Sequence, residues 1–304
     1  MELRHLRHFV AVVDAGNLSK AAERVFITQP ALTRSIKNLE ELLGAELLER
    51  RPRGIVPTPA GDALYRYARL MLNEAARAQA EVLAVQKGAK GELAVGIAAM
   101  FADHIVDRAV AAVCGSGRDV ALTITQGFFE ELVEALRDGR LDVIFSNLSS
   151  MELPDDVAIE PIIDLHAYVY AGSDHPLVGQ KGIDKQALLK HRWAVVDQPH
   201  MRDFLDYYFV AEGLATPDYV VRTNSLNLIC SLIANGGFLG VLPEHVIRRR
   251  VRRGQVKTVE APGVPIVRKA GLLTRKSMPP RPVVDLFTEE LRNACKSDAF
   301  GAWE

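Results

Sequence analysis

The sequence predicts a chain of two parts, α+β at its N-terminal end and α/β beyond, joined by one long helix. Three observations support this fold class. Three short amphipathic helical patterns precede a basic hairpin that ends near residue 58. A heptad pattern then runs from Leu64 to Val85. After Gly91, short apolar segments alternate with helical patterns, as in a parallel sheet covered by helices.

The first two helical patterns are short and closely spaced. The first places Leu6 and Phe9 on one face and stops before Gly16. The second begins at Asn17 or Ser19, either of which can cap a helix. A short turn then leads into a third pattern.

The third pattern predicts a helix from Gln29 to Leu43. Thr28 can cap it by accepting a bond from the Ala31 amide, and Pro30 lies in the first turn, where no N–H is needed. One face is apolar and consists of Leu32, Ile36, Leu39 and Leu43. The opposite face carries Gln29, Thr33, Arg34 and Lys37. Such a helix could be an ordinary amphipathic helix with a solvated face, or one that lies in the major groove of DNA.

A basic hairpin follows and favours the DNA interpretation. Residues 49–58 predict a short strand, a Pro/Gly turn and a return strand, with Arg50, Arg51 and Arg53 clustered at the turn. Three helices and such a hairpin form a winged helix-turn-helix, in which the hairpin cations lie on phosphates or in the minor groove. The alternative is a solvated turn. The whole chain has a net charge of −1, and the segment up to Thr58 contains nine cations and seven anions. DNA binding would therefore depend on where the cations of this segment lie.

The long helix starts with Thr58 as cap and Pro59 at its first position. Its small and apolar positions alternate in steps of four and three, which is a heptad seam: Leu64, Ala68, Met71, Ala75, Ala78, Val82 and Val85. We expect this seam to pair with a second copy of the chain; the alternative is that it packs on its own chain. Residues 87–91 predict a hinge.

The remainder predicts two α/β subdomains, with the chain returning to the first at its end. The first contains strands at 93–97, 120–124 and 143–145 and helices at 102–113 and 129–137. The second contains strands at 167–170, 194–196, 219–221 and 238–241 and helices at 185–190, 204–212, 226–235 and 244–252. A late strand at 270–274 and a helix at 282–295 close the chain.

Composition and motifs exclude several functional classes. Three widely spaced cysteines form no CxxC pair, so neither a disulfide framework nor a zinc module is expected. No P-loop, GxGxxG after a strand, GxSxG or HExxH is present, so we expect no catalytic residues, no metal site and no cofactor. The N-terminus lacks signal-peptide character and no apolar run is long enough for a membrane, which predicts a cytoplasmic protein. A solute-binding protein and an architectural DNA protein remain alternatives.

Four segments resemble the LysR-type transcriptional regulators. The run from Leu6 to Gly61 does so over essentially its whole length. The segments Gly139–Val143, Asp174–Leu177 and Ile233–Pro243 resemble the family's G-x-L-D, HPL and V-A-x-G-x-G-I-x-x-L-P motifs. The resemblance covers almost the full chain.

The resemblance implies a DNA reader at 1–58, a dimerising linker helix at 59–90, and an effector-binding domain at 91–304 that resembles periplasmic solute-binding proteins. Its first subdomain would span about 91–163 and 266–304, and its second about 164–265. Family members commonly form dimers and tetramers, respond to a small co-inducer and act on promoter DNA, with RNA polymerase as a further partner. We hypothesise that effector binding changes the angle between the subdomains and that the linker helices transmit this change to the paired readers.

The resemblance also assigns candidate residues. Those for DNA are Thr28, Gln29, Pro30, Thr33, Arg34, Lys37, Arg51 and Arg53. Ligands of open α/β sheets bind beyond the carboxyl ends of the strands. That rule gives Ala99, Met100, Phe128, Ser146, Asn147, His200, Arg202 and Asn224 for the effector. His200 and Arg202 point to a carboxylate ligand, unless both are ordinary surface residues, whereas Ala99 replaces a Ser or Thr that many family members use to grip an anion.

Overall fold

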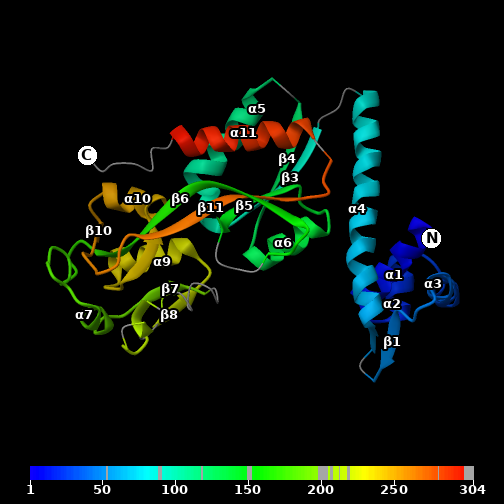
Figure 1. Cartoon of the computed structure of the whole chain (residues 1–304), viewed down its shortest axis with the longest axis horizontal. Helices are drawn as coiled ribbons and strands as arrows, with labels where there is room; N and C mark the ends of the chain where they lie inside the picture. The colour runs from blue at the N-terminus through cyan, green and yellow to red at the C-terminus, as the bar shows by residue number, and fades with distance from the viewer. Residues whose placement is uncertain are drawn as a thin grey trace.

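The computed structural model describes most of the chain. The described residues are 1–52, 54–87, 91–117, 119–148, 153–197, 205, 208–211, 213–217, 220–279 and 281–297, without the side chains of 84–87, 104 and 297. Figure 1 shows a long helix, α4 (Pro59–Lys87), standing beside a larger C-terminal body, with the N-terminal helices packed at its lower end.

The N-terminal elements follow the predicted pattern. They are α1 (Leu3–Ala15), α2 (Leu18–Arg24), α3 (Gln29–Leu43), β1 (Leu48–Arg51) and β2 (Gly54–Pro57). The Asn17 side chain accepts bonds from the amides of Ser19 and Lys20, so Asn17 rather than Ser19 caps α2. Thr28 caps α3 as predicted, by accepting from the Ala31 amide at 3.4 Å. One core buries the apolar faces of these helices: Leu6, Phe9, Val12, Ala21, Ala22, Leu32, Ile36, Leu39, Leu47 and Ala68, called the N-terminal core here.

The hairpin of β1 and β2 is held against the end of α1. Its strands pair antiparallel, with Arg51 opposite Gly54. The Ile55 amide donates to the Gly16 carbonyl at 2.8 Å. A Cβ on Gly54 would lie only 2.6 Å from that same carbonyl oxygen, and the φ of Gly54 is 132°, so this close approach requires glycine.

Helix α4 is fixed to the N-terminal core at its first turn. The Thr58 hydroxyl donates to the Glu46 carbonyl at 2.7 Å and accepts from the Gly61 amide at 3.0 Å, which confirms Thr58 as the cap. A Cβ on Gly61 would lie 2.0 Å from the Leu47 carbonyl oxygen. One turn later Tyr65 donates to Asp14 of α1. The start of α4 is therefore part of the N-terminal unit.

The heptad seam of α4 divides into two parts. Ala68 is fully buried in the N-terminal core and Leu64 packs against it. The prediction that the whole seam faces a second copy is therefore wrong for these two residues, because the adjacent helices cover them. Further along, Met71 and Val82 remain exposed at 41% and 58%. Among the described side chains of the seam, those from Met71 onward are therefore the ones left accessible to a partner.

The C-terminal body is built on one sheet of seven strands. Its strand order is β10-β6-β11-β5-β3-β4, and β9 also pairs with β6. The strands are β3 (Gly91–Ile97), β4 (Val120–Gln126), β5 (Val143–Leu148), β6 (Val157–Gly172), β9 (Gly240–Pro243), β10 (Val256–Thr258) and β11 (Ile266–Arg275). A smaller parallel pair joins β7 (Ala194–Val196) and β8 (Val221–Thr223). Because β3 pairs parallel with both β4 and β5, the predicted parallel unit is present.

Helices cover the sheet on both sides (Figure 1). They are α5 (Asp107–Gly115), preceded by short turns η1 (Ala99–Phe101) and η2 (Ala102–Val106), then α6 (Phe129–Arg137), α7 (Lys185–Leu189), α9 (Leu226–Asn235), α10 (Glu244–Arg252) and α11 (Pro282–Ser297). Helices α5 and α11 pack on one side of β3 and β5, and α6 packs on the other. Of the predicted helix at 204–212, the structure describes residues 205 and 208–211, and those at 205 and 208–210 are helical.

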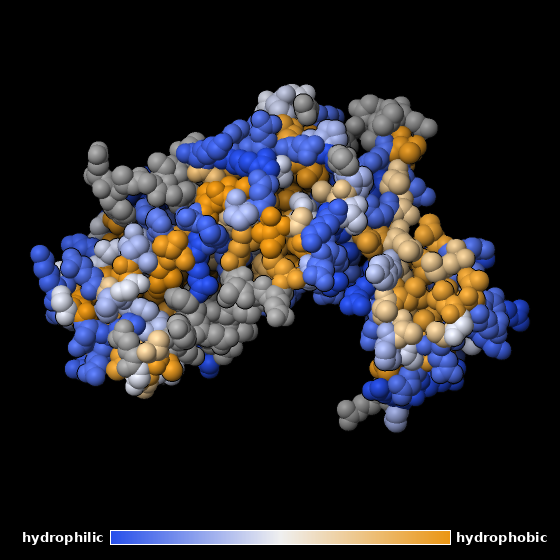
Figure 2. All heavy atoms as spheres, in the orientation of Figure 1, coloured by the Kyte–Doolittle hydropathy of each residue, from blue (hydrophilic) through white to orange (hydrophobic). Residues whose placement is uncertain are grey.

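Figure 2 shows how side chains of different character are distributed over one face of the molecule. Hydrophobic atoms surface along α4 and the N-terminal helices beside it, and hydrophilic atoms gather at the far end of the N-terminal unit. The exposed apolar part of α4 is therefore separate from the polar end of that unit.

Two long strands connect the halves of the body, and the sequence pattern revealed only part of each. β6 and β11 pair antiparallel from Ile266 opposite Ala167 to Arg275 opposite Val157. Pro161 interrupts the alternation that would predict a strand, and beside it the pairing register shifts by one residue between Ala270 and Gly271, leaving Ile162 of β6 as the extra residue. The sequence pattern did not predict β10, and β8 and β9 lie two residues later than expected.

Replacing Gly61 should destabilise the protein. Gly61→Ala adds a Cβ against a backbone carbonyl that cannot move freely, so we expect the free energy of unfolding to fall by about 1–3 kcal/mol. Gly115→Ala is the matched control, because Gly115 ends α5 with no atom within 4 Å of an added Cβ. Chemical denaturation measures both variants. Equal stabilities of Gly61→Ala and wild type would show that the contact of α4 with Leu47 is not tight.

Candidate functional site

Helix α3 presents a polar face to solvent. Leu32, Ile36 and Leu39 turn into the N-terminal core. On the other side, Arg34 and Lys37 are exposed, and so is the N-terminal end of the helix: Thr28, Gln29, Pro30 and Ala31. Thr33 is partly buried. The structure thus brings the six residues at α3 that the sequence assigned to DNA onto one accessible region.

Two hydrogen bonds order the first turn of that region. The Ser19 hydroxyl of α2 donates to the Gln29 side-chain carbonyl at 3.0 Å. This bond holds Gln29 by its oxygen and leaves its amide hydrogens to donate outward. The Thr33 hydroxyl donates back to the Gln29 backbone carbonyl at 3.0 Å, so its oxygen can act only as an acceptor toward another molecule.

The cations of this face are weakly held. Lys37 lies 3.6 Å from Glu41 in an exposed pair, which costs little to exchange for a phosphate. Within the described residues no ion pair includes Arg34. On the hairpin, Arg50 is exposed and Arg51 pairs with Glu49 at 3.1 Å. Arg53, predicted for the hairpin turn, lies outside the described residues.

A cavity of about 540 Å³ lies in the C-terminal body, between the ends of β3, β4 and β5 and the elements around β9. Six residues predicted for the effector line it: Ala99, Met100, Phe128, Ser146, Asn147 and Asn224. His200 and Arg202 lie outside the described residues. Most of the remaining wall is apolar: Ala98, Phe129, Leu165, Ala167, Val196, Leu226, Val241, Leu242, Pro243 and Ile266.

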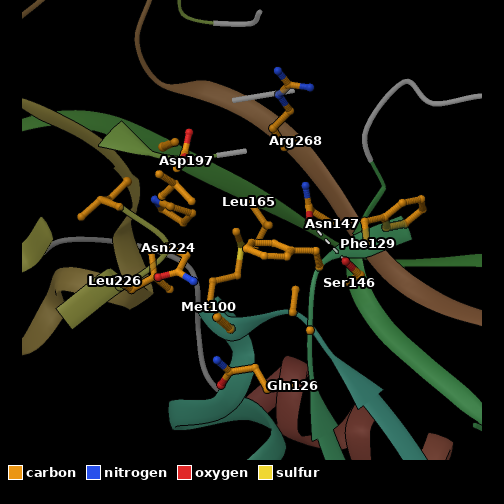
Figure 3. Close-up of a pocket in the computed structure, with 18 of the residues that line it drawn as sticks. Met100, Gln126, Phe129, Ser146, Asn147, Leu165, Asp197, Asn224, Leu226 and Arg268 are labelled. Atoms are coloured by element: carbon orange, nitrogen blue, oxygen red, sulfur yellow. Dashed lines mark hydrogen bonds between the residues drawn. The ribbon is translucent and has the colours of Figure 1, made fainter. Parts of the chain in front are cut away.

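The polar groups of the cavity lie at separate places on its wall. In Figure 3 the Met100 side chain extends between Asn224 and Leu226 on one side and Ser146 on the other. Ser146 is fully buried, and its hydroxyl donates to the Asn147 side-chain oxygen at 3.2 Å. The amides of Asn147 and Asn224 therefore provide neutral donors and acceptors inside an apolar chamber.

Four charged residues of the lining were missed by the sequence reasoning: Glu130, Glu131, Asp197 and Arg268. Glu131 accepts a bond from the Phe128 amide at 3.3 Å and so occupies the first turn of α6. Burial lowers the pKa of the Arg268 guanidinium. Arg268 lies on β11 opposite Leu165 of β6. The rule applied to the sequence concerns the carboxyl ends of parallel strands. It therefore does not predict Arg268, which lies within an antiparallel strand that forms one wall.

Helix α6 links this cavity to α4. Its first residues, Phe129 and Glu130, line both the cavity and a second hollow of about 440 Å³ between α6 and α4. Its C-terminal end lies against α4. There the Asn73 side-chain amide donates to the Asp138 backbone carbonyl at 2.7 Å, and Arg69 pairs with the Asp138 carboxylate at 3.2 Å.

Beside this contact, buried ion pairs bind α4 to the body. Asp142 is the centre: its carboxylate lies 3.0 Å from Arg77 of α4 and 2.6 Å from Arg281. Its other oxygen accepts from the Ala94 amide of β3 at 2.9 Å. Two α4 carboxylates complete the set, because Glu81 pairs with Arg281 at 3.0 Å and Glu74 pairs with Arg275 at 2.7 Å. We call Arg69, Asn73, Glu74, Arg77, Glu81, Asp138, Asp142, Arg275 and Arg281 the junction.

Arg275 shows how tightly the junction is enclosed. Its side chain is only 4% exposed, and it donates to the carbonyls of Leu136 and Leu141 at 2.6 and 2.9 Å. Burial lowers the pKa of this guanidinium, and the Glu74 carboxylate partly offsets that effect. The arginine thus joins α4 to the end of α6 and the turn after it.

Comparisons with known proteins show which families this chain resembles. Residues 3–62 match the sequence model of the bacterial regulatory helix-turn-helix proteins of the lysR family. Residues 86–296 match that of the LysR substrate binding domain. The HTH-type transcriptional regulator CysL of Bacillus subtilis (strain 168) is 27% identical over 293 residues, which cover 96% of this chain and 97% of CysL.

Two solved structures are similar over nearly the whole chain. A full-length variant of OxyR from Pseudomonas aeruginosa has a TM-score of 0.65 and 25% identity, covering 96% of this chain and 95% of that one. Full-length CbnR in complex with its target DNA has a TM-score of 0.53 and 26% identity, covering 97% and 99%. Within the described residues, no helix combines the length and apolar character that crossing a membrane requires.

Proposed function

This chain belongs to the LysR family of bacterial transcriptional regulators, and we propose that α3 reads promoter DNA while the 540 Å³ cavity holds the effector that controls it. The chain is a DNA-binding regulator with an effector-binding domain, and it forms oligomers as LysR regulators do. The observation that carries the proposal is the exposed polar face of α3 on a helix whose other face is buried.

We call the exposed face of α3 with Thr28, Gln29, Pro30, Thr33, Arg34 and Lys37 the reading face. Its residues would make different kinds of contact with DNA. Gln29 and Arg34 have outward N–H groups suited to base edges in the major groove. Lys37, one turn further along, suits either a base or a phosphate, and Arg50, Arg51 and Arg53 suit phosphates or the minor groove. Thr28 and Pro30 fix the start of the helix. Because one α3 reaches only a few base pairs, two readers spaced by α4 would supply the specificity.

The cavity favours a ligand with a large apolar body and a few polar atoms. Its described wall is mostly apolar and includes the cation Arg268, whose guanidinium has several N–H donors that can bond a carboxylate. Glu130, Glu131 and Asp197 also line the cavity and would repel a second negative charge on the ligand. Ala99 provides no hydroxyl for gripping an anion. We therefore propose a monocarboxylate, with Asn147 and Asn224 bonding its other polar atoms.

Coupling between the two sites would run through α6 and the junction. A ligand that displaces Phe128 or Phe129 acts on the first turn of α6. The other end of α6 contacts Asn73 and Arg69 of α4. Since α4 is also fixed to the N-terminal core, a small tilt of α6 would change the direction of α3. The exposed seam of Met71 and Val82 would join two such α4 helices.

We propose neither a catalytic activity nor a location outside the cytoplasm for this chain. The relatives found are transcriptional regulators, and we propose that this chain is likewise not an enzyme. Because its partner is promoter DNA, we place it in the cytoplasm. The domain limits expected from sequence, 1–58, 59–90 and 91–304, remain our proposal, with the addition that the start of α4 packs in the N-terminal core.

Replacing Arg34 should weaken and broaden DNA binding. Arg34→Ala removes a base-edge donor, so we expect a loss of about 1–3 kcal/mol in binding and a relaxed sequence preference at one position. Arg53→Ala should instead weaken binding to all sequences and reduce its dependence on salt. The duplex is one selected by the wild-type protein from a random pool, and gel-shift titration gives the affinities. Arg252→Ala, exposed on α10, is the control. Unchanged binding by Arg34→Ala would remove Arg34 from the reading face.

Filling the cavity should abolish the response to ligands. The test is a thermal-shift screen of aromatic monocarboxylates, their amides and dicarboxylates of equal length. We expect the monocarboxylates to raise the melting temperature most, because Arg268 meets one charge and the acidic side chains repel the second. Ala99→Phe should remove the shift while the protein without ligand melts as before, because Ala99 is only partly buried. A larger shift with dicarboxylates would contradict the assignment of ligand class.

A further inference from the structure

One exposed aromatic residue stands directly before the reading helix. Phe26 lies in the turn between α2 and α3, two residues before the cap Thr28. Its exposed fraction is 93%, higher than that of any other large hydrophobic residue in the described part of the chain. A phenyl ring left in water contributes nothing to folding, so the fold itself does not explain its presence.

The backbone at Phe26 makes this choice of residue more unusual. Its φ is 57°, and it is the one non-glycine residue with a positive φ among those the structure describes. Its amide donates to the Glu23 carbonyl at 3.2 Å, and the Ile27 amide donates to Ala22 at 3.0 Å. This pair of bonds is a Schellman motif, whose left-handed position normally takes Gly or Asn. A bulky residue there costs free energy.

The turn demands the left-handed conformation, but no described part of the chain covers the ring or demands phenylalanine. Strain that persists without an internal benefit indicates a role outside the folded chain. The residues around it are exposed and suited to DNA: Arg24 ends α2, and Thr28 and Gln29 begin α3. A second copy of the chain has a different surface to meet, the exposed seam at Met71 and Val82 of α4.

We propose that the Phe26 ring contacts an apolar carbon surface of the DNA at the edge of the major groove. A helix that enters the groove by its N-terminal end brings the preceding turn beside the backbone. Two apolar surfaces lie there, the 5-methyl group of thymine and the deoxyribose ring, and Phe is suited to the methyl group. Phe26 thereby adds affinity, and selectivity for thymine when the methyl group is the contact. The proposal rests on the placement of α3 given above.

The test compares Phe26→Asn, Phe26→Gly and Phe26→Tyr with wild type on a duplex selected by the wild-type protein from a random pool. Asn and Gly relieve the left-handed strain, so both variants should melt at a higher temperature while binding about fivefold more weakly. The slope of log affinity against log salt should not change, because no phosphate contact is lost. Phe26→Tyr keeps the ring and should bind like wild type. A residue of purely structural importance would not combine higher stability with weaker binding.

Replacing each thymine of the duplex by uracil, one at a time, then locates the contact. If the ring meets a methyl group, one uracil weakens wild-type binding and leaves Phe26→Asn unaffected. If no uracil has this effect while Phe26→Asn still binds weakly, the contact is with deoxyribose. Equal affinity of Phe26→Asn, Phe26→Gly and wild type would overturn the proposal, as would a change in the oligomeric state of the variants by sedimentation. The Arg34→Ala experiment tests the placement of α3 on DNA, and its failure can be distinguished from a failure of the Phe26 contact.

Discussion

The buried carboxylate of Asp142 joins helix α4 to the C-terminal body, and the arrangement of the two ends of the chain depends on this contact. The carboxylate is 2% exposed and lies between Arg77 of α4 and Arg281 of the C-terminal body, while its second oxygen receives the Ala94 amide. Removing one partner of such a buried group leaves a charge without compensation, which costs about 3–5 kcal/mol. Because α4 also shares the N-terminal core through Ala68, this carboxylate lies at the centre of the junction that connects the N-terminal unit to the sheet.

This arrangement changes how a ligand could act on DNA. A free hinge at residues 87–91 would let the two ends move independently, and effector binding would then have no defined outcome. The junction instead makes α4 and the first part of the body one unit. Helix α6 lines the cavity at Phe129 and ends beside the junction at Asp138, and we propose that a shift of one end moves the other. The antiparallel strands β6 and β11 run through both halves of the body, so the two halves share one sheet.

Sequence reasoning found what depends on local patterns. The helix from Gln29 to Leu43, its cap Thr28 and the strand–helix alternation follow from short-range spacing, and the structure confirms them. Contacts between segments far apart in the sequence leave no short-range pattern, so they were not predicted. Arg268 reaches the cavity through an antiparallel pairing, the junction joins residues about 200 positions apart in sequence, and the start of the predicted seam was already covered by the N-terminal helices. The strain at Phe26 depends on a backbone angle, and no residue pattern reveals it.

The most direct test is a distance measurement across the junction. Cys114 is exposed whereas Cys230 and Cys295 are buried, so a nitroxide on Cys114 and another on Asn38→Cys of α3 would report on the two ends of one chain. Labelled chains are diluted with unlabelled ones, and electron–electron double resonance gives the distance. We predict one narrow distribution for wild type and for Asp156→Asn, which removes only the exposed pair with Arg137, and a broad one for Asp142→Asn. A wild-type distribution as broad as that of Asp142→Asn would contradict the account.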